Sequence, residues 1–243
     1  MSAPDLSSLL ADLDRDYLPH LSVNGVIFGT HGGALKVLLM ESAGTGTWSL
    51  PGGYVRREEA IDAAAARVVQ DMTGLSDTLL RQFHTFGGPS RGEAVIADAL
   101  RALGIAAPPE HWALGRVVSV GYVAVVESTR AQVTPNAWTR SMAWSDLSER
   151  PPLIIDHDEM VERALATVRS QIDDLALAAN LLPAEFTMPE LQTLHETVLG
   201  RALDRRNFQK RMLDLGLVER LPDHRTGARR KPTYMYRWVK RGS

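Results

Sequence analysis

The chain has 243 residues, 44% of them hydrophobic and 23% charged, which is ordinary for a water-soluble protein with one large domain, or a medium and a small one. There is no apolar run of about 18 residues, which argues against a membrane span, and no cysteine, which excludes disulfides and thiolate sites. Residues 183–243 hold 13 Lys and Arg against 7 Asp and Glu, whereas residues 1–182 hold 14 against 22. A basic C-terminal segment on an acidic body indicates a polyanionic partner.

The N-terminal part predicts a helix followed by a β-hairpin. The opening segment, MSAPDLSSLLADLDRDYL, has acids and no basic start, so we expect no secretory signal and a cytoplasmic location. Leucines spaced by three or four over residues 5–18 predict an amphipathic helix, and we expect residues 1–20 to form this element. Residues 21–28 and 35–40 are typical of strands, with His31-Gly32-Gly33 as the turn between them.

The segment from Pro51 to Leu75 predicts a glycine loop followed by a helix. Gly52 and Gly53 are expected to let the chain turn where a side chain would clash. Glu58 and Glu59 lie at the expected helix start, where acids favour the positive end of the helix dipole. The apolar face of this helix is expected to contain Ile61, Ala64, Val68 and Met72. Gly74 is expected to end the helix.

This segment resembles the Nudix box, the motif G-x5-E-x7-R-E-U-x-E-E-x-G-U of the Nudix hydrolases, in which U is apolar. The frame fits without a gap, with the shared positions at Gly53, Glu59, Arg67, Gly74 and Leu75. The resemblance implies a Nudix-like α/β/α sandwich, of the α/β (α+β) class.

Three positions depart from the box. The family has Glu after the Arg and a Glu pair near the end, and here these positions are Val68, Asp71 and Met72. Pyrophosphate hydrolysis needs Mg²⁺ held by several oxygen ligands, and Val and Met supply none. Glu59 and Asp71 are then a remnant of the metal site, and Asp71 is expected to pair with Arg67 one helical turn away. We therefore expect a scaffold without metal, cofactor or catalytic residues.

The middle of the chain predicts further strands and an inserted helix. Residues 90–114 contain the helical segment EAVIADALRALGI. In the run Asp156 to Glu159, four metal-binding side chains follow one another, but successive residues face apart. Asp156 is expected to cap a helix over residues 158–172, with His157 facing a pocket as the alternative. Strands are expected at residues 79–85, 116–126 and 137–144.

The C-terminal segment predicts a small domain that begins after the break at Asn180 to Pro183. Thr187 and Glu190 have the spacing of a capping box, which opens a helix that ends at Gly200. Asp204 is expected to cap a second helix, whose buried face is expected to contain Phe208, Met212 and Leu215. The second helix and two following strands are expected at residues 205–215, 217–221 and 234–239.

Helix, turn, helix and a basic hairpin is the order of a winged helix, which binds double-stranded DNA. Its second helix can enter the major groove while the wing contacts phosphate. The residues expected to contact DNA are Arg205, Arg206, Asn207, Gln209 and Lys210 in the helix and Arg225, Arg229, Arg230 and Lys231 in the wing.

A Nudix-like domain followed by FTMPELQTLHETVLGRALDRRNF resembles the Nudix-related transcriptional regulators. That family includes bacterial repressors of NAD metabolism and sugar-responsive regulators of pentose use. The resemblance implies a homodimer on a pseudo-palindromic operator, with residues 21–182 as the effector-sensing domain and 183–243 as the DNA-binding domain. The former catalytic cleft would then be the effector site, with candidate residues Gly52, Gly53, Arg56, Arg116 and His157.

The sequence thus predicts a ligand-responsive regulator that senses a small molecule, either a pentose such as arabinose or an ADP-ribose or NAD-related nucleotide. The insertion and the FTMPEL segment favour the sugar-responsive branch. One alternative is a Mg²⁺-dependent Nudix hydrolase of a nucleoside-diphosphate derivative, using Glu59 and Asp71 with Glu58 or Asp62. Another is a binding protein whose C-terminal segment serves only for dimerisation.

Overall fold

The computed structural model describes residues 9–31, 34–76, 78–89, 91–102, 104–131, 139–172, 181–225 and 233–239. The chain divides into two compact units. The first unit comprises Met1–Gly29 and Lys36–Leu165, and the second comprises Thr30–Leu35 and Ala166–Ser243. The expected domain limits at residues 20 and 182 stay predictions. Within the described residues, no helix is both long and apolar enough to cross a membrane.

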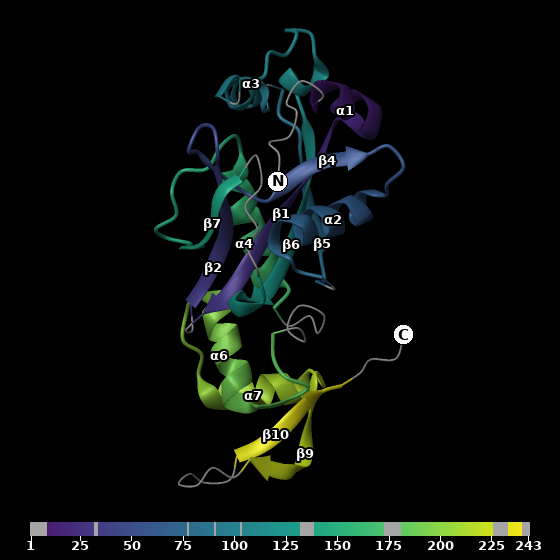
Figure 1. The fold of residues 1–243 in the computed structure, drawn as a ribbon. Coiled ribbons are helices and arrows are strands. Elements are labelled where there is room, and N and C mark those ends of the chain that lie inside the picture. Colours follow the sequence, from purple (N-terminus) through teal and green to yellow (C-terminus); the bar gives the residue numbers. More distant parts are fainter. Residues whose placement is uncertain are drawn as a thin grey trace. The chain divides into compact units, whose positions relative to one another are not determined.

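A single sheet is the centre of the first unit (Figure 1). Its strand order is β3-β2-β1-β6-β5, with β4 paired to β1 and β7 paired to β2. The strands in the described residues are β1 (Tyr17–His31), β2 (Ala34–Ser42), β3 (Trp48–Ser49), β4 (Gly52–Arg56), β5 (Arg81–Phe86), β6 (Val118–Glu127) and β7 (Thr139–Asp146).

Strand β1 is longer than its sequence pattern predicted. The pairing of β1 with β4 shifts register between Tyr17 and Ser22, and His20 has a positive φ of 63°. The strand therefore continues through an irregularity at Pro19 and His20, where the expected strand did not extend. The expected turn at residues 32–33 lies outside the described residues.

Helices cover both faces of the sheet. Along β1 and β6, Val23 and Tyr122 pack against α2 (Ile61–Thr73), while the alternate residues Val26 and Val123 are also fully buried. Alternation along a strand sends successive side chains to opposite faces, so the second face is covered too. Figure 1 shows α4 (His157–Ser170) on the side of the sheet away from α2. The expected α/β/α arrangement is confirmed.

The remaining helices of this unit are short. The helix expected over residues 5–18 is described from Leu9 to Asp16 as α1, and Tyr17 and Leu18 belong to β1 instead. The inserted helix is present as α3 (Glu93–Ala102). Two 3₁₀ turns follow, η1 (Trp112–Leu114) and η2 (Ser128–Arg130). In Figure 1, α1 and α3 lie at the same end of the sheet, and both contribute side chains to the cavity described below.

Two side-chain predictions for these helices were wrong. Ile61, expected on the buried face of α2, is 38% exposed, because the buried face runs through Ala64, Val68 and Val69 instead. Asp156, expected to cap α4, instead accepts two hydrogen bonds from the Arg91 side chain.

In the second unit, local sequence signals set the boundaries of the elements. Thr187 and Glu190 form the complete capping box of α6 (Met188–Leu199), which ends at Gly200 with φ 68°. Asp204 accepts a hydrogen bond from the Asn207 N–H and caps α7 (Arg205–Asp214). The strands, in the order β8-β10-β9, are β8 (Glu185–Thr187), β9 (Val218–Arg225) and β10 (Thr233–Trp238).

Helices α6 and α7 pack on this sheet through one apolar core. Phe186, Leu191, Phe208, Met212 and Tyr236 are buried together in it. Leu215, expected in the same core, is 44% exposed, so this prediction was wrong. Strand β8 was not expected, since a strand of three residues is too short to show a period of two.

Candidate functional site

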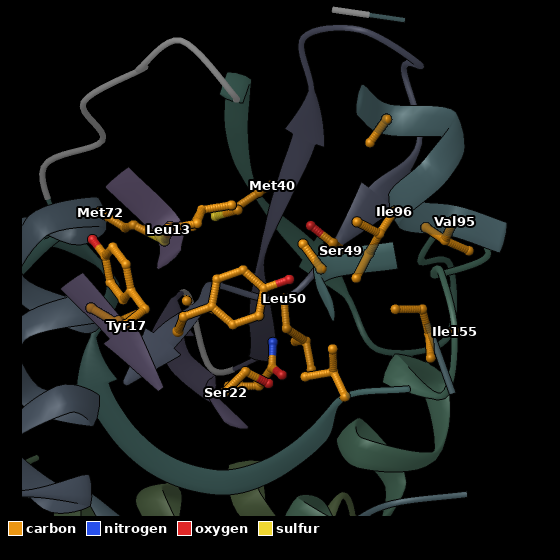
Figure 2. Close-up of a pocket in the computed structure, with 18 of the residues that line it drawn as sticks. Leu13, Tyr17, Ser22, Met40, Ser49, Leu50, Met72, Val95, Ile96 and Ile155 are labelled. Atoms are coloured by element: carbon orange, nitrogen blue, oxygen red, sulfur yellow. The ribbon is translucent and has the colours of Figure 1, made fainter. Parts of the chain in front are cut away.

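The first unit contains a cavity of about 730 Å³ with a mostly apolar wall. Figure 2 shows Leu13, Tyr17 and Met72 on one side of it and Val95, Ile96 and Ile155 on the other. These side chains come from α1, β1, α2, α3 and the turn before α4, so the cavity lies where the sheet meets three helices and this turn. Its size is typical of sites for small organic ligands.

The structure brings together three of the five candidate effector residues. Gly52, Gly53 and His157 line the cavity. Arg56 and Arg116 are exposed and are not among the lining residues. The Arg116 side chain instead donates to the carbonyl oxygen of Gly87 at 2.6 Å.

Gly52 and Gly53 have a different role from the expected turn. Both lie in β4, paired with Asn24 and Val23 of β1, and neither has a positive φ. A Cβ atom on Gly52 would lie 2.2 Å from the Asn24 side-chain nitrogen, and one on Gly53 would lie 3.0 Å from Val68. The glycines are therefore required by the close approach of neighbouring groups.

The Arg and the first Glu of the box bind each other. The Arg67 guanidinium donates to both carboxylate oxygens of Glu59, at 2.7 and 2.8 Å, and to the Tyr54 carbonyl at 3.0 Å. The Arg56 N–H also donates to Glu59. These hydrogen bonds lower the pKa of Glu59, and the Arg67 bond is the largest cause. The expected Arg67–Asp71 pair is longer, at 3.9 Å, and Asp71 is 63% exposed.

The Glu59–Arg67 pair makes a prediction for acid stability. A carboxylate with a lowered folded-state pKa stabilises the fold above its unfolded value of about 4.3, and this stabilisation is lost as the pH falls through the folded value. Glu59→Gln is expected to lower the free energy of unfolding by about 1–3 kcal/mol at pH 7, and the difference from wild type should shrink below pH 4. Urea titrations across this pH range test it, with the exposed neighbour Glu58→Gln as control. A difference between Glu59→Gln and wild type that does not change with pH would contradict it.

The box residues that face the cavity are a poor donor set for the Mg²⁺ of the hydrolases. Val68 and Met72 line the cavity with apolar atoms, and Asp71 is the box carboxylate that lines it. Glu59 is engaged by Arg67. No group of three or more potential metal-ligating side chains was found among the described residues. The residues present therefore do not fit a hard divalent cation.

Arg91 and His157 form a polar corner in the wall. Arg91 pairs with Asp156 at 2.8 Å, and its side chain is only 4% exposed. His157 accepts a hydrogen bond from the Leu50 N–H at its Nδ1 atom. Burial, together with the nearby Arg91 charge, lowers the pKa of His157 to about 4. The ring is therefore neutral at neutral pH, with its proton on Nε2.

An aromatic group completes the wall. The ring of Tyr54 makes edge-to-face contacts with Tyr17 and Trp112, with ring centroids 6.3 and 5.0 Å away. Tyr17 and Tyr54 line the cavity, and burial raises the pKa of Tyr54 to about 12. The sequence pattern did not single out Arg91 or Tyr54, since nothing in their local sequence marks them as cavity residues.

In the second unit, α7 presents the side chains expected to contact DNA. Phe208 and Met212 are buried, whereas Arg205, Arg206, Asn207 and Lys210 are exposed. Gln209 is half-buried, with its amide 3.5 Å from the Tyr236 hydroxyl.

The expected wing residues Arg229, Arg230 and Lys231 lie outside the described residues, and Arg225 is described by its backbone alone. In the described part of the hairpin, the Arg220 guanidinium lies over the Tyr234 ring, 3.1 Å from its centroid. This cation–π contact keeps the Arg220 guanidinium on the surface of the hairpin.

Comparisons with known proteins match both units. Residues 18–164 match the Nudix domain, and residues 178–238 match the NrtR DNA-binding winged helix domain. The chain therefore belongs to the Nudix family. Its winged helix gives it the domain order of the Nudix-related transcriptional regulators, which confirms the resemblance and the fold class expected from the sequence.

Individual relatives agree with this assignment. The ADPR responsive transcriptional repressor NtrR of Acinetobacter baylyi is 26% identical over 91% of this chain and 82% of its own. The crystal structure of Shewanella oneidensis NrtR with a 27mer DNA is 26% identical, with a TM-score of 0.67 over 90% of this chain and 93% of that chain. The ADP-ribose pyrophosphatase of Methanocaldococcus jannaschii is 24% identical over 61% of this chain and 75% of its own.

Proposed function

We propose that this chain is an ADP-ribose-responsive transcriptional repressor that binds its operator as a homodimer and senses its effector in the Nudix cavity without hydrolysing it. The observation that carries the proposal is the position of Val68 and Met72. Both occupy carboxylate positions of the Nudix box, and both line the wall of a ligand-sized cavity. The cavity can thus hold a small organic molecule, whereas Val68 and Met72 offer no oxygen atoms to coordinate a metal ion.

ADP-ribose is favoured over a pentose as the effector. The name of the Acinetobacter baylyi relative, which aligns with 91% of this chain, describes a response to ADPR. A cavity of about 730 Å³ with aromatic and apolar walls also suits a ligand with a base and two sugars better than a single polar ring. The comparisons give no support to the pentose branch.

The effector is tested by the melting temperature of the full chain with ADP-ribose, NAD, arabinose and other pentoses, with and without Mg²⁺. A ligand that binds only the folded state raises the stability by about 2.7 kcal/mol at a hundredfold excess over its Kd. We expect a shift with ADP-ribose that does not depend on Mg²⁺. A shift with a pentose alone would assign the chain to the sugar-responsive branch instead.

The enzyme alternative lacks its extra carboxylates at the site. Neither Glu58 nor Asp62 lines the cavity, and Asp62 accepts a hydrogen bond from the Tyr122 hydroxyl. Incubation with ADP-ribose and Mg²⁺ is therefore expected to release no AMP or ribose phosphate above background. Hydrolysis of ADP-ribose that is abolished by Asp71→Asn would instead support a Nudix hydrolase.

DNA binding is proposed to use the exposed face of α7. Arg206 and Lys210 are four residues apart, so their side chains project from one face of the helix. Changing both to Ala is expected to weaken operator binding at least tenfold and to lower the slope of log affinity against log salt by about 3–4 for the dimer, because two phosphate contacts are lost in each protomer. Fluorescence anisotropy at several salt concentrations measures both quantities.

Arg101→Ala is the matched control, because this arginine is exposed on α3 in the other unit. It should leave DNA binding unchanged. Wild-type affinity in the Arg206→Ala/Lys210→Ala variant would rule out the docking of α7. A wild-type chain with no salt-dependent DNA binding would favour a C-terminal segment used only for dimerisation.

A further inference from the structure

Arg91 differs from the other arginines that line the cavity. Its side chain is 4% exposed, compared with 19% for Arg67 and 66% for Arg15. Arg67 is held by both oxygens of Glu59. Arg15 lies at the surface and pairs with neighbouring aspartates of α1. Arg91 is therefore the buried cation of this wall.

The donors of Arg91 are only partly used. Its Nε atom donates to both oxygens of Asp156, at 2.8 and 3.0 Å, and its Nη1 atom donates to the Val117 carbonyl at 3.2 Å. Its Nη2 atom is buried and has no hydrogen-bond partner among the described residues. A buried donor without an acceptor is unfavourable, and a ligand that supplies an acceptor removes this cost.

His157 adds a second donor to the same wall. Because its Nδ1 atom accepts from the Leu50 N–H, the neutral ring carries its proton on Nε2 and can only donate there. Asp156, the carboxylate next to it, is occupied by Arg91. The polar corner thus offers donors, and its carboxylate is already satisfied, which suits a ligand group that only accepts hydrogen bonds.

Resting on the proposed effector-binding function of this cavity, we propose that Arg91, assisted by His157, binds an anionic oxygen of the effector and makes the cavity select phosphate-containing ligands over neutral sugars. A guanidinium forms charge-assisted hydrogen bonds with phosphate oxygens, which are stronger than those between neutral groups. A pentose hydroxyl forms no such bond. Arg91 would therefore determine that the cavity binds a phosphate-containing effector and not a neutral pentose.

The backbone beside this corner is strained. Ile155 lines the cavity just before Asp156 and has a φ of 58°, which is unfavourable for a β-branched residue. Since Nη2 is buried, the bound oxygen reaches it only when the side chains that cover it shift.

Calorimetric titration of the full chain with ADP-ribose, adenosine and inorganic pyrophosphate tests the proposal. Wild type should bind ADP-ribose more tightly than adenosine, because adenosine lacks the phosphates. Arg91→Gln should weaken ADP-ribose binding by about 10- to 100-fold, the effect of one lost charge-assisted contact, and should leave adenosine binding unchanged. Arg91→Lys keeps a charge beside Asp156 but loses the fork of donors, and it should also weaken ADP-ribose at least tenfold.

Arg101→Gln is the matched control, since that arginine is exposed on α3 and does not line the cavity, and it should bind as wild type. Equal wild-type affinity for ADP-ribose and adenosine, which is measured without any variant, would overturn the anion site. So would ADP-ribose binding that is unchanged in Arg91→Lys, or loss of both ligands together in a folded variant. If wild type binds pyrophosphate through Arg91 but not ADP-ribose, the anion site stands and the proposed effector falls. If it binds neither, both fall.

Discussion

Phe208→Ala is expected to lower the stability of the winged helix by about 3–5 kcal/mol, the usual effect of deleting a buried aromatic ring. Phe208 is 4% exposed, packs beside Met212 and makes an edge-to-face contact with His195, with ring centroids 4.9 Å apart. It anchors α7 to α6 and to the small sheet. Without it, the arginines of α7 lose the framework that holds them on one face.

Leu213→Ala is the matched control for this prediction, because Leu213 lies on the same helix but is 42% exposed. We expect it to change stability by less than about 1 kcal/mol. Differential scanning calorimetry of the full chain measures the transitions, and anisotropy measures operator binding. Equal melting of the two variants would show that α7 is not held by the core that surrounds Phe208.

The sequence predicted the C-terminal domain well because its signals are local. Thr187 and Glu190 cap α6 through bonds that span three residues, and Asp204 caps α7 in the same way. Such contacts need no knowledge of the tertiary fold. Leu215 was wrong because a helical period does not show where the core ends: this residue still has helical backbone angles, yet its side chain is 44% exposed.

The corner of the cavity could not be predicted, because its contacts are distant in sequence. Arg91 and Asp156 are 65 positions apart, and His157 and Leu50 are 107 apart. Asp156 has the sequence context of a helix cap, yet its carboxylate binds Arg91. Arg91 has Asp156 as its carboxylate partner in the structure, and leaving a buried cation without a partner is costly.

The sequence predicted the positions of the Nudix box residues correctly, but it did not predict the hydrogen bonds between them. Its Arg and first Glu have a structural role, since Arg67 binds Glu59 before α2 and also donates to the Tyr54 carbonyl of β4. This role is structural, so it persists whether or not a metal is bound. At two other carboxylate positions of the box this chain has Val68 and Met72, which line the cavity with apolar side chains.

Val68→Glu is expected to be strongly destabilising, although it restores a residue of the family motif. Val68 is 3% exposed and packs with Val23, Val55 and Ala65. Its Cγ2 atom lies 3.0 Å from the position that a Cβ of Gly53 would occupy. A carboxylate packed among these apolar side chains is largely removed from water, and an uncompensated buried charge costs about 3–5 kcal/mol.

Met72→Glu is the control, since Met72 lies one turn further along α2 and is only partly buried, so the new carboxylate can reach water. It should cost less than about 1 kcal/mol. Melting of both variants with and without Mg²⁺ separates loss of packing from repair of a metal site. We expect no stabilisation of Val68→Glu by Mg²⁺, because Glu59 stays bound to Arg67. A Val68→Glu chain that melts like wild type, or that gains stability with Mg²⁺, would mean that the cavity still has the capacity of a hydrolase site.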